Sequence, residues 1–212
     1  MFLHHATPLH YLPHILQSGA LYPQSVLAAR GIQPRRTAAR RDRMLGLADW
    51  VHLSLSADTP LLRNKLAKGY PHALLVFDRA AVLSLPHVAL LPFNTKAWRS
   101  RAACQPVTDA GQMAELLRRH AETGRFPSLA VLVRYGLGFE ALTQIAFSDA
   151  ASQEAISALV NTLPLPVAAP LTVAPALFPA LPPPPLSDAL RDYFAACHAA
   201  GTLLPPPDLP FD

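Results

Sequence analysis

The first twenty-one residues constrain the fold more than any other stretch of this chain. The segment FLHHATP, from Phe2, predicts a short strand that carries His5 and Thr7 toward its far end. A helix is predicted directly after it, because apolar residues recur at helical spacing and Gly19 supplies a stop signal. The apolar positions are Leu9, Leu12, Ile15 and Leu16. A strand end followed by a helix start is a common binding place for a small anion, so this junction is a candidate site.

Further strand and helix signals follow in an irregular order. Strands are predicted at residues 50–56, 73–77, 88–91, 129–133, 142–148 and 171–178. Helices are predicted at residues 60–68, 109–122, 152–163 and 187–200. Several strands are too close together for helical crossovers, so the sequence predicts a mixed α+β fold rather than a regular parallel sheet.

Composition excludes several classes of protein. Apolar residues make up 51% of the 212, yet no run is long enough to span a bilayer, and no basic segment precedes an apolar one at the start. We therefore expect neither a signal peptide nor a membrane partner. The two cysteines, Cys104 and Cys197, form no disulfide framework, which favours a reducing cytoplasm. With the nine histidines they show no metal-ligand spacing, and no Gly-x-Ser-x-Gly elbow is present, so a metalloenzyme and a serine hydrolase are disfavoured.

Charge is unevenly distributed along the chain. Residues 1–125 hold sixteen of the 18 Lys and Arg and seven of the 14 acids, for a net charge of +9, whereas residues 126–212 carry −5. The segment 30–43 alone contains six Arg and one Asp, and it is predicted as a loop or a short mobile helix outside the core. Such a basic region indicates either a polyanion partner or simply a solvated surface.

Proline marks a change in composition near the C-terminus. Thirteen of the 23 prolines occur from Pro164 onward, with runs at residues 182–185 and 205–207 on either side of one predicted helix. Such runs are extended spacers. We expect one domain at residues 1–178 and a proline-rich tail at 179–212. The tail helix is expected to pack on the domain surface because Leu190, Tyr193 and Phe194 need burial, although a partner-docking tail is an alternative.

Three blocks of sequence resemble the DarT family, the DNA ADP-ribosyltransferase toxins of DarT–DarG toxin–antitoxin systems. The opening HHATPLHYLPHILQSGAL is similar to the family's Tyr-His-x-Thr-His strand and following helix, with His4, Pro8 and Tyr11 replacing the family's Tyr, second His and Asn. GLADWVHLSLSADTPLL resembles the family's second block, and LAVLVRYGLGFEALTQIAF its last strands. The resemblance covers residues 1 to about 178. It implies an ADP-ribosyltransferase-like fold with a strongly twisted mixed central sheet and flanking helices.

The third block also holds the largest departure from the family. Where the family has its catalytic Glu, before Val-Leu-Val, this sequence has Ala130, and the nearest acid, Glu140, lies in the next element. The chain is therefore expected to be inactive or weakly active. It is either a natural pseudoenzyme or a form in which Glu was replaced so that a toxic protein could be produced. We favour the second explanation because the rest of the frame is intact; an alanine codon in the source gene would exclude it.

The resemblance implies NAD as the substrate and assigns candidate contacts to it. His5, Thr7, Leu21 and Trp50 are the candidates for NAD binding. One arginine among Arg40, Arg41 and Arg43 is expected to reach the pyrophosphate or help activate the acceptor, since a guanidinium pairs with phosphate in a bidentate manner. The alternatives are a satisfied, half-buried His5, a Trp50 that packs in the core and solvated arginines.

The family's acceptor is a base of single-stranded DNA, either thymine or guanine, and nothing in the sequence decides between the two bases. Unpaired bases bind by stacking and backbone charge. The segment KAWRSR is a second basic and aromatic cluster that fits this role, unless it is an exposed loop with one packed Trp. The candidate DNA contacts are Lys96, Trp98, Arg99, Arg101 and Arg125. A cognate DarG-like antitoxin, a monomeric state and the absence of a metal are also expected.

Other readings of the sequence remain open. The chain can be a non-catalytic module that binds NAD or nucleic acid, or an ADP-ribosyltransferase that acts on RNA or protein. It can also be an interaction protein whose proline-rich tail recruits a partner.

Overall fold

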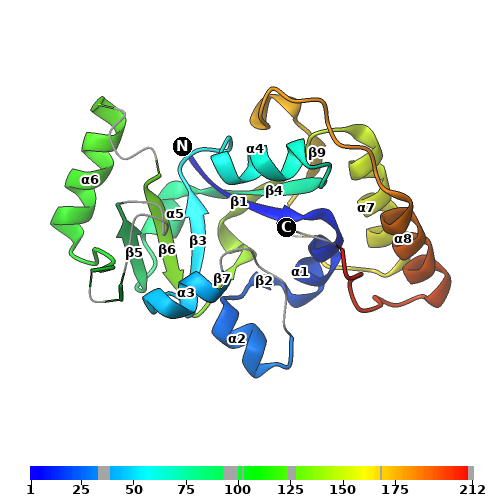
Figure 1. Ribbon diagram of the computed structural model, residues 1–212, viewed down its shortest axis with the longest axis horizontal. Coiled ribbons are helices and arrows are strands. Elements are labelled where there is room, and N and C mark those ends of the chain that lie inside the picture. The colour runs from blue at the N-terminus through cyan, green and yellow to red at the C-terminus, as the bar shows by residue number, and fades with distance from the viewer. Residues whose placement is uncertain (33–38, 93–99, 102, 124–127, 168, 210–212) are drawn as a thin grey trace.

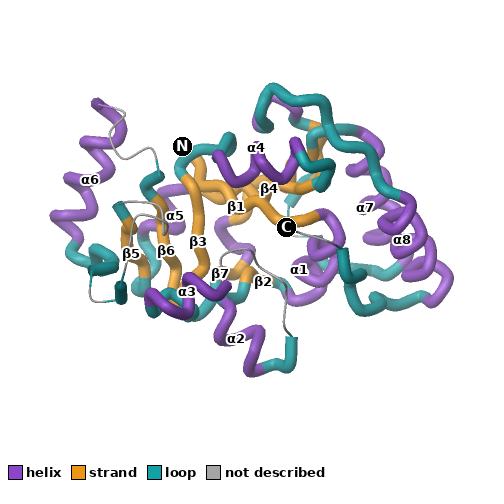
Figure 2. The backbone as a smooth tube through the Cα atoms, in the orientation of Figure 1, coloured by secondary structure: helices purple, strands orange, loops and turns teal. Residues whose placement is uncertain are grey.

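A computed structural model describes residues 1–32, 39–92, 100–101, 103–123, 128–167 and 169–209, in which strands and helices alternate irregularly (Figure 1 and Figure 2). The strands are β1 (Phe2–Pro8), β2 (Ala20–Leu21), β3 (Trp50–Ser54), β4 (His72–Asp78), β5 (Val88–Leu91), β6 (Ala130–Arg134), β7 (Leu137–Gly138), β8 (Leu142–Phe147) and β9 (Leu171–Val173). The helices are α1 (Leu12–Ser18), α2 (Gln24–Ala29), α3 (Ala39–Leu45), α4 (Pro60–Ala67), α5 (Arg79–Leu83), α6 (Ala110–Thr123), α7 (Ala150–Thr162) and α8 (Asp188–Ala200). Short 3-10 turns are η1 (Leu9–Tyr11), η3 (Phe139–Ala141) and η4 (Pro175–Leu177).

The described part of the chain builds a seven-stranded sheet in the order β5-β6-β3-β1-β4-β8-β9 and a small sheet of β2 and β7. Neighbouring strands are antiparallel except for β8 and β9, which are parallel. In Figure 1, β3 and β6 run steeply across the direction of β1 and β4, as expected for a strongly twisted sheet. The predicted mixed α+β class is confirmed.

The large sheet is divided between β1 and β3. Strand β1 pairs with β4 along its whole length, from Phe2 to Pro8. Among the described residues, β1 and β3 form a single backbone pair, His4 with Ser54. The sheet therefore consists of two parts, β5-β6-β3 and β1-β4-β8-β9, that meet at this one pair and diverge beyond it.

The two faces of the sheet are covered differently. One face carries the main hydrophobic core, to which β1, β3, β4, β6 and β8 all contribute. The opposite face carries two smaller clusters. One lies at the end of α3 and includes Leu45, Leu47 and Leu132. The other lies under α4 and includes Leu62 and Leu74. The candidate site described below lies on this second face, where the apolar packing is divided into two separate clusters.

Local signals in the sequence account for several element boundaries. The Thr59 hydroxyl accepts from the Leu62 amide at 3.2 Å, which starts α4 as predicted, and Pro60 follows at its first position. Helix α1 ends at Gly19, whose left-handed backbone stops the helix. The carboxylate of Asp78 accepts from the Ala81 amide at 2.8 Å and starts α5, a helix that the apolar pattern had not indicated.

The structure corrects one prediction and decides between two alternatives of another. A strand over residues 171–178 is wrong in its second half, because the strand ends at Val173 and a 3-10 turn begins at Pro175, which has no N–H to offer a sheet. In the basic segment 30–43, residues 33–38 lie outside the described part, and Arg40, Arg41 and Arg43 lie on the short helix α3, one of the two alternatives that the sequence left open.

The C-terminal helix packs on the rest of the fold. Leu190, Tyr193 and Phe194 of α8 are buried in the main core, as expected. The Tyr193 hydroxyl lies 2.8 Å from His14 Nε2 in α1 and donates to the Leu204 carbonyl at 3.1 Å. In Figure 1, α8 lies beside α7 at one end of the molecule. The proposed division at residue 178 stays a prediction, and the helix beyond it is part of the core.

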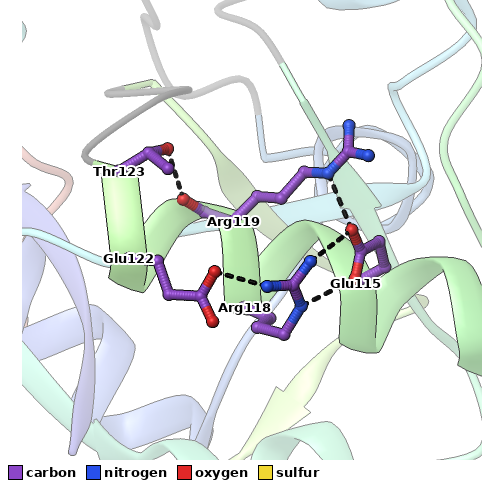
Figure 3. A network of polar contacts seen from close by, with 5 residues as sticks. All are labelled: Glu115, Arg118, Arg119, Glu122 and Thr123. Carbon is purple, nitrogen blue, oxygen red and sulfur yellow. Dashed lines mark hydrogen bonds and ion pairs between the residues drawn. The ribbon is translucent and has the colours of Figure 1, made fainter.

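Helix α6 lies at the opposite end of the molecule and has no buried residue in the described structure. An ion-pair network lies on its surface (Figure 3). Glu115 contacts Arg118 and Arg119 at 2.7 Å each, and Arg118 also pairs with Glu122. Arg118 and Arg119 lower the pKa of Glu115 to about 2. All four side chains are largely exposed, so each pair contributes little to the stability of the fold.

Among the helices that the structure describes, none combines the length and the apolar character needed to span a bilayer.

Replacing Leu190 by Ala tests whether the tail helix belongs to the cooperative core. Leu190 is 1% exposed, so the substitution is expected to lower the free energy of unfolding by about 2–5 kcal/mol. Leu181→Ala, at a side chain that is 41% exposed, is the control and is expected to change it by less than about 0.5 kcal/mol. The measurement is urea unfolding followed by circular dichroism. Equal effects of the two substitutions would mean that α8 is only loosely attached.

Candidate active site

A row of four residues crosses the sheet where its two parts meet. His4 of β1 pairs with Ser54 of β3, Ser54 pairs with Ala130 of β6, and Ala130 pairs with Leu91 of β5. Cross-strand partners share a face of the sheet, so these side chains project on the same side. That side is the face with two separate clusters, and Ala130 packs at the border of the α3 cluster. His4 and Ala130 are two strand spacings apart, roughly 10 Å.

His4 brings an unusual polar group to this row. Within the described part of the chain, its Nδ1 is buried and has no hydrogen-bond partner. Burial lowers the pKa of His4, and a hydrogen bond to the Ser54 backbone opposes that shift in part. A neutral imidazole with an unsatisfied buried nitrogen loses free energy unless a ligand or a water molecule completes it. His4 is therefore suited to hold a hydroxyl or an amide of a substrate.

His5, the predicted NAD contact, occupies the split between the two parts of the sheet. Its Nδ1 donates to the His52 carbonyl of β3 at 3.0 Å. Its backbone pairs with Leu75 of β4, so its Cβ lies on the opposite face of β1 from that of His4. Thr7 is 3% exposed and also lies on the face of the main core. His5 thus bridges β1 and β3, while Thr7 is enclosed.

Two further buried histidines lie in elements next to β1. His10 of η1 is 1% exposed, and burial together with the neighbouring His72 and His14 lowers its pKa to about 4. His72 of β4 is also buried. Its Nδ1 donates to the Tyr70 carbonyl at 2.8 Å, and burial lowers its pKa to about 4 despite that hydrogen bond. Lys65 and His5 add to the lowering at His72. The region beside the predicted strand–helix junction therefore holds neutral imidazoles.

Two other predicted NAD contacts lie away from the row. Trp50 pairs with Arg134, at the far end of β3 and β6 from Ala130, four residues and about 13 Å along the strand. It is partly buried and packs on the α3 cluster, which corresponds to the alternative of core packing. Leu21 of β2 is 3% exposed and belongs to the main core.

The arginines gather around the same end of the sheet as Trp50. Arg40 and Arg43 of α3 are exposed and Arg41 is partly buried. The Arg101 side chain lies over Gly46, just after α3, where an added Cβ would approach its Nε at 2.8 Å. The structure therefore brings Arg101 to the arginines of α3. The other predicted DNA contacts, Lys96, Trp98, Arg99 and Arg125, lie outside the described residues.

No carboxylate projects from the row itself, since its four members are His4, Ser54, Ala130 and Leu91. Glu140 is exposed in η3, and its carboxylate lies against Gly138 of the small sheet, not beside Ala130. The row offers the polar side chains of His4 and Ser54 but has no acid that stabilises a developing cation. Within the described ranges, no group of three His, Cys, Asp or Glu is placed to hold a metal ion.

His4 and Ser54 are candidate residues that the motif argument did not select. A signal for Ser54 was present, because the alternation in WVHLSLS places Trp50, His52 and Ser54 on one face of a strand. His4 was noted only as a replacement of the family's Tyr. Its nearness to Ala130 depends on how β1, β3 and β6 pair, and local sequence patterns do not contain that pairing.

The fold has counterparts among solved structures. DarT from Thermus sp. 2.9 in complex with ADP-ribosylated single-stranded DNA matches at a TM-score of 0.65 and 15% identity, over 84% of this chain and 96% of that chain. The same protein in complex with NAD+ matches at 0.63 and 15%, over 84% and 97%. Thermosipho africanus DarTG in complex with ADP-ribose matches at 0.59 and 14%, over 83% and 50%. No protein-family model and no curated protein matches the chain. The fold is DarT-like, as the sequence resemblance predicted.

The buried histidines make stability depend on pH. His10 and His72 have a pKa of about 4 when folded and an ordinary value near 6.5 when unfolded. Between these values the unfolded chain binds more protons, so the free energy of unfolding is expected to fall by roughly 2–5 kcal/mol as the pH drops from 6.5 to 4. Urea unfolding at a series of pH values measures this loss. His10→Gln, which cannot titrate, is expected to flatten the slope, and an unchanged slope would contradict the assignment.

Proposed function

We propose that this chain is the toxin component of a toxin–antitoxin system and an NAD-dependent DNA ADP-ribosyltransferase. Its reaction is transfer of ADP-ribose from NAD to a thymine or guanine base of single-stranded DNA. With alanine at position 130, this sequence is inactive or weakly active.

The observation that carries the proposal is the row His4–Ser54–Ala130 at the split of a DarT-like sheet. The resemblance aligns Ala130 with the family's catalytic Glu, and the pairing of β1, β3 and β6 puts Ser54 next to this position and His4 one strand further on. Solved DarT structures of the same fold hold NAD+ and ADP-ribosylated single-stranded DNA, which supports NAD as the substrate and DNA as the acceptor.

The reaction requires that the ribose and the nicotinamide of NAD be held in place, and in our proposal this row does so. The bond between ribose C1′ and the nicotinamide nitrogen breaks, and nicotinamide leaves with the bonding electrons. An atom of the base attacks C1′ and loses its proton. Because positive charge develops on the ribose, electrostatic stabilisation at that point is the main task of the protein. In our proposal, His4 Nδ1 accepts from a ribose hydroxyl or from the carboxamide of nicotinamide.

This chain lacks the carboxylate that the resemblance places at position 130. A Glu on β6 would hold the ribose hydroxyls, stabilise the cationic ribose and take the proton from the base. The methyl group of Ala130 can do none of these. The predicted activity of this chain is therefore lower than that of a Glu-bearing form by on the order of 10²–10⁴-fold from the acid–base contribution alone.

The basic end of the sheet supports a polyanionic acceptor. The three arginines of α3 and Arg101 lie near the ends of β3 and β6, in the half of the chain that carries +9. In this proposal an α3 arginine contacts the pyrophosphate of NAD and others contact the DNA backbone. A DarG-like antitoxin is the corresponding partner, and the chain acts as a cytoplasmic monomer.

Ala130 itself favours a second candidate function. A chain that keeps the fold and the buried His4 but lacks the acid can serve as a non-catalytic module that binds NAD or nucleic acid. The two candidates differ in whether restoring the carboxylate restores transfer.

Ala130→Glu is expected to create transfer activity. Single-stranded oligonucleotides of mixed sequence are incubated with NAD and each variant, and mass spectrometry measures the gain of one ADP-ribose on the DNA. The rate with Glu is expected to exceed that with Ala by about 10²-fold or more. Ala130→Gln, which has the size of Glu without its charge, is the matched control and is expected to stay inactive. Fragment ions identify the modified base.

Each other result of this assay has a definite meaning. NAD binding by the Ala130→Glu variant without transfer to DNA would move the acceptor to RNA or protein. Absence of NAD binding at micromolar to millimolar concentrations in both forms would contradict the transferase assignment and leave nucleic-acid binding as the function.

Removing the imidazole of His4 is expected to weaken NAD binding. Loss of one hydrogen bond at a buried nitrogen corresponds to an increase in Kd of about tenfold for His4→Phe. Isothermal titration of the Ala130 form with NAD measures this without turnover. His198→Phe on α8 is the control, since His198 is exposed and α8 lies at the end of the molecule away from β3 and β6. An unchanged Kd for His4→Phe would remove His4 from the site.

A further inference from the structure

A cluster of aromatic and cationic side chains lies at the end of β3 and β6 that is remote from Ala130. The Arg134 guanidinium lies 4.8 Å from the Tyr135 ring centroid and 5.7 Å from that of Trp50. The ring of His87 meets that of Tyr135 edge to face, with centroids 5.8 Å apart. Tyr135 is 53% exposed, and Arg134 and His87 are also exposed. Four π or cationic groups therefore share one solvent-facing patch.

A second arginine–tyrosine pair lies next to this cluster. The Arg30 guanidinium lies 4.0 Å from the Tyr22 ring centroid. Tyr22 packs against the backbone of Gly136, the residue after Tyr135, where an added Cβ would meet the Tyr22 ring at 3.3 Å. Glycine at 136 thus allows Tyr22 to pack beside the turn that carries Tyr135. In Figure 1, α2, β7 and these strand ends are gathered in one region.

The backbone holds Tyr135 firmly in an unfavourable conformation. Its φ is +69°, a left-handed value that costs a bulky residue about 1 kcal/mol or more. The Tyr135 amide donates to the Asp49 carbonyl and the Arg134 amide to the His87 carbonyl, both at 2.9 Å. Asp or Asn would fit the turn with less strain. The turn therefore presents an exposed aromatic ring at a cost in stability, as binding sites do.

We propose that Tyr135 and Arg134, continued by Tyr22 and Arg30, form a stacking platform for unpaired nucleotides that flank the reacting base. The tyrosine rings stack on bases and the guanidinium groups contact phosphates, a combination that suits single strands of any sequence. Duplex DNA keeps its bases stacked on each other and offers them no free face. The platform rests on the proposed function, because it extends the DNA path away from Ala130.

Distances and charges fit this path. Tyr135 follows the last residue of β6, so it lies roughly 15 Å along the strand from Ala130, a span of a few nucleotides. Asp49 approaches Arg134 at 3.9 Å, and both side chains are 44% exposed, so this pair is weak and leaves Arg134 able to contact phosphate. The α3 arginines and Arg101 add positive charge on the same end of the sheet.

The test is binding of fluorescein-labelled single-stranded DNA of mixed sequence to the full Ala130 chain, measured by anisotropy. Tyr135→Asn removes the ring and tolerates φ above zero, so the fold is kept and the Kd is expected to rise at least about fivefold. Tyr135→Phe keeps the ring and is expected to bind like the parent. Arg134→Gln is expected to weaken binding and to reduce its salt dependence.

Arg191→Gln on α8 is the matched control for Arg134→Gln, because Arg191 is an exposed arginine that approaches Asp188 at 3.6 Å. It is expected to change neither affinity nor salt dependence. Ultraviolet crosslinking of the oligonucleotide, mapped by mass spectrometry, is expected to label the peptide that contains Tyr135. Melting temperatures no lower than that of the parent show that the readout is binding rather than folding.

The outcomes separate this proposal from the proposed function. If the parent binds single-stranded DNA and Tyr135→Asn binds it equally well, the platform is overturned and DNA modification still stands. The platform is also overturned if Ala130→Glu alone and Ala130→Glu combined with Tyr135→Asn modify DNA with the same KM for the oligonucleotide. If the parent binds no single-stranded DNA at 50 mM salt, the platform and the DNA acceptor are both rejected, while NAD binding is tested separately.

Discussion

The hydrogen bond from His5 Nδ1 to the His52 carbonyl is the interaction on which the site depends. Where β1 and β3 diverge, ladder hydrogen bonds between them are lost, and a buried carbonyl without a donor is costly. The His5 ring supplies a donor at 3.0 Å from the neighbouring strand and so satisfies β3 across the split. The His5 side chain thus stabilises the divergence of the two parts of the sheet. A polar row can form at the point where the two parts still meet.

This geometry gives two adjacent histidines different roles. On one face of β1, His5 donates a hydrogen bond to the backbone carbonyl of His52. His4 lies on the other face, and its buried Nδ1 has no hydrogen-bond partner in the described structure. The first-strand histidine of the motif thus has a structural contribution here besides any contact with NAD. His4, which stands where the family has Tyr, is the histidine that shares a face with Ala130.

The sequence predicted what local chemistry determines and missed what depends on pairing. Thr59 and Gly19 mark helix ends through their own hydroxyl and backbone freedom, so both were predicted correctly. The end of the last strand at Val173 depends on Pro175 and on β8 as a parallel neighbour, and the prediction ran past it. His4 and Ser54 are 50 positions apart in the sequence and Ser54 and Ala130 are 76 apart, and only the register of three strands brings them together. The proposed arginine–tyrosine platform was missed for the same reason, because the pairing of β2 with β7 brings Tyr22 to Gly136, the residue after Tyr135.

Position 130 shows how little the fold depends on the group that the chemistry needs. Ala130 is half buried between Ser54 and Leu91 and packs against the α3 cluster. A carboxylate there would be partly desolvated beside an apolar cluster, and burial lowers the pKa of the nearby His4, which disfavours a compensating positive charge. An unpaired acid in that position weakens the fold until substrate binds, whereas alanine fits the cluster without such a cost. The sheet, its split and the buried histidine can therefore persist intact with alanine at 130. The group at position 130 therefore determines the chemistry of the row while the fold is maintained by its neighbours.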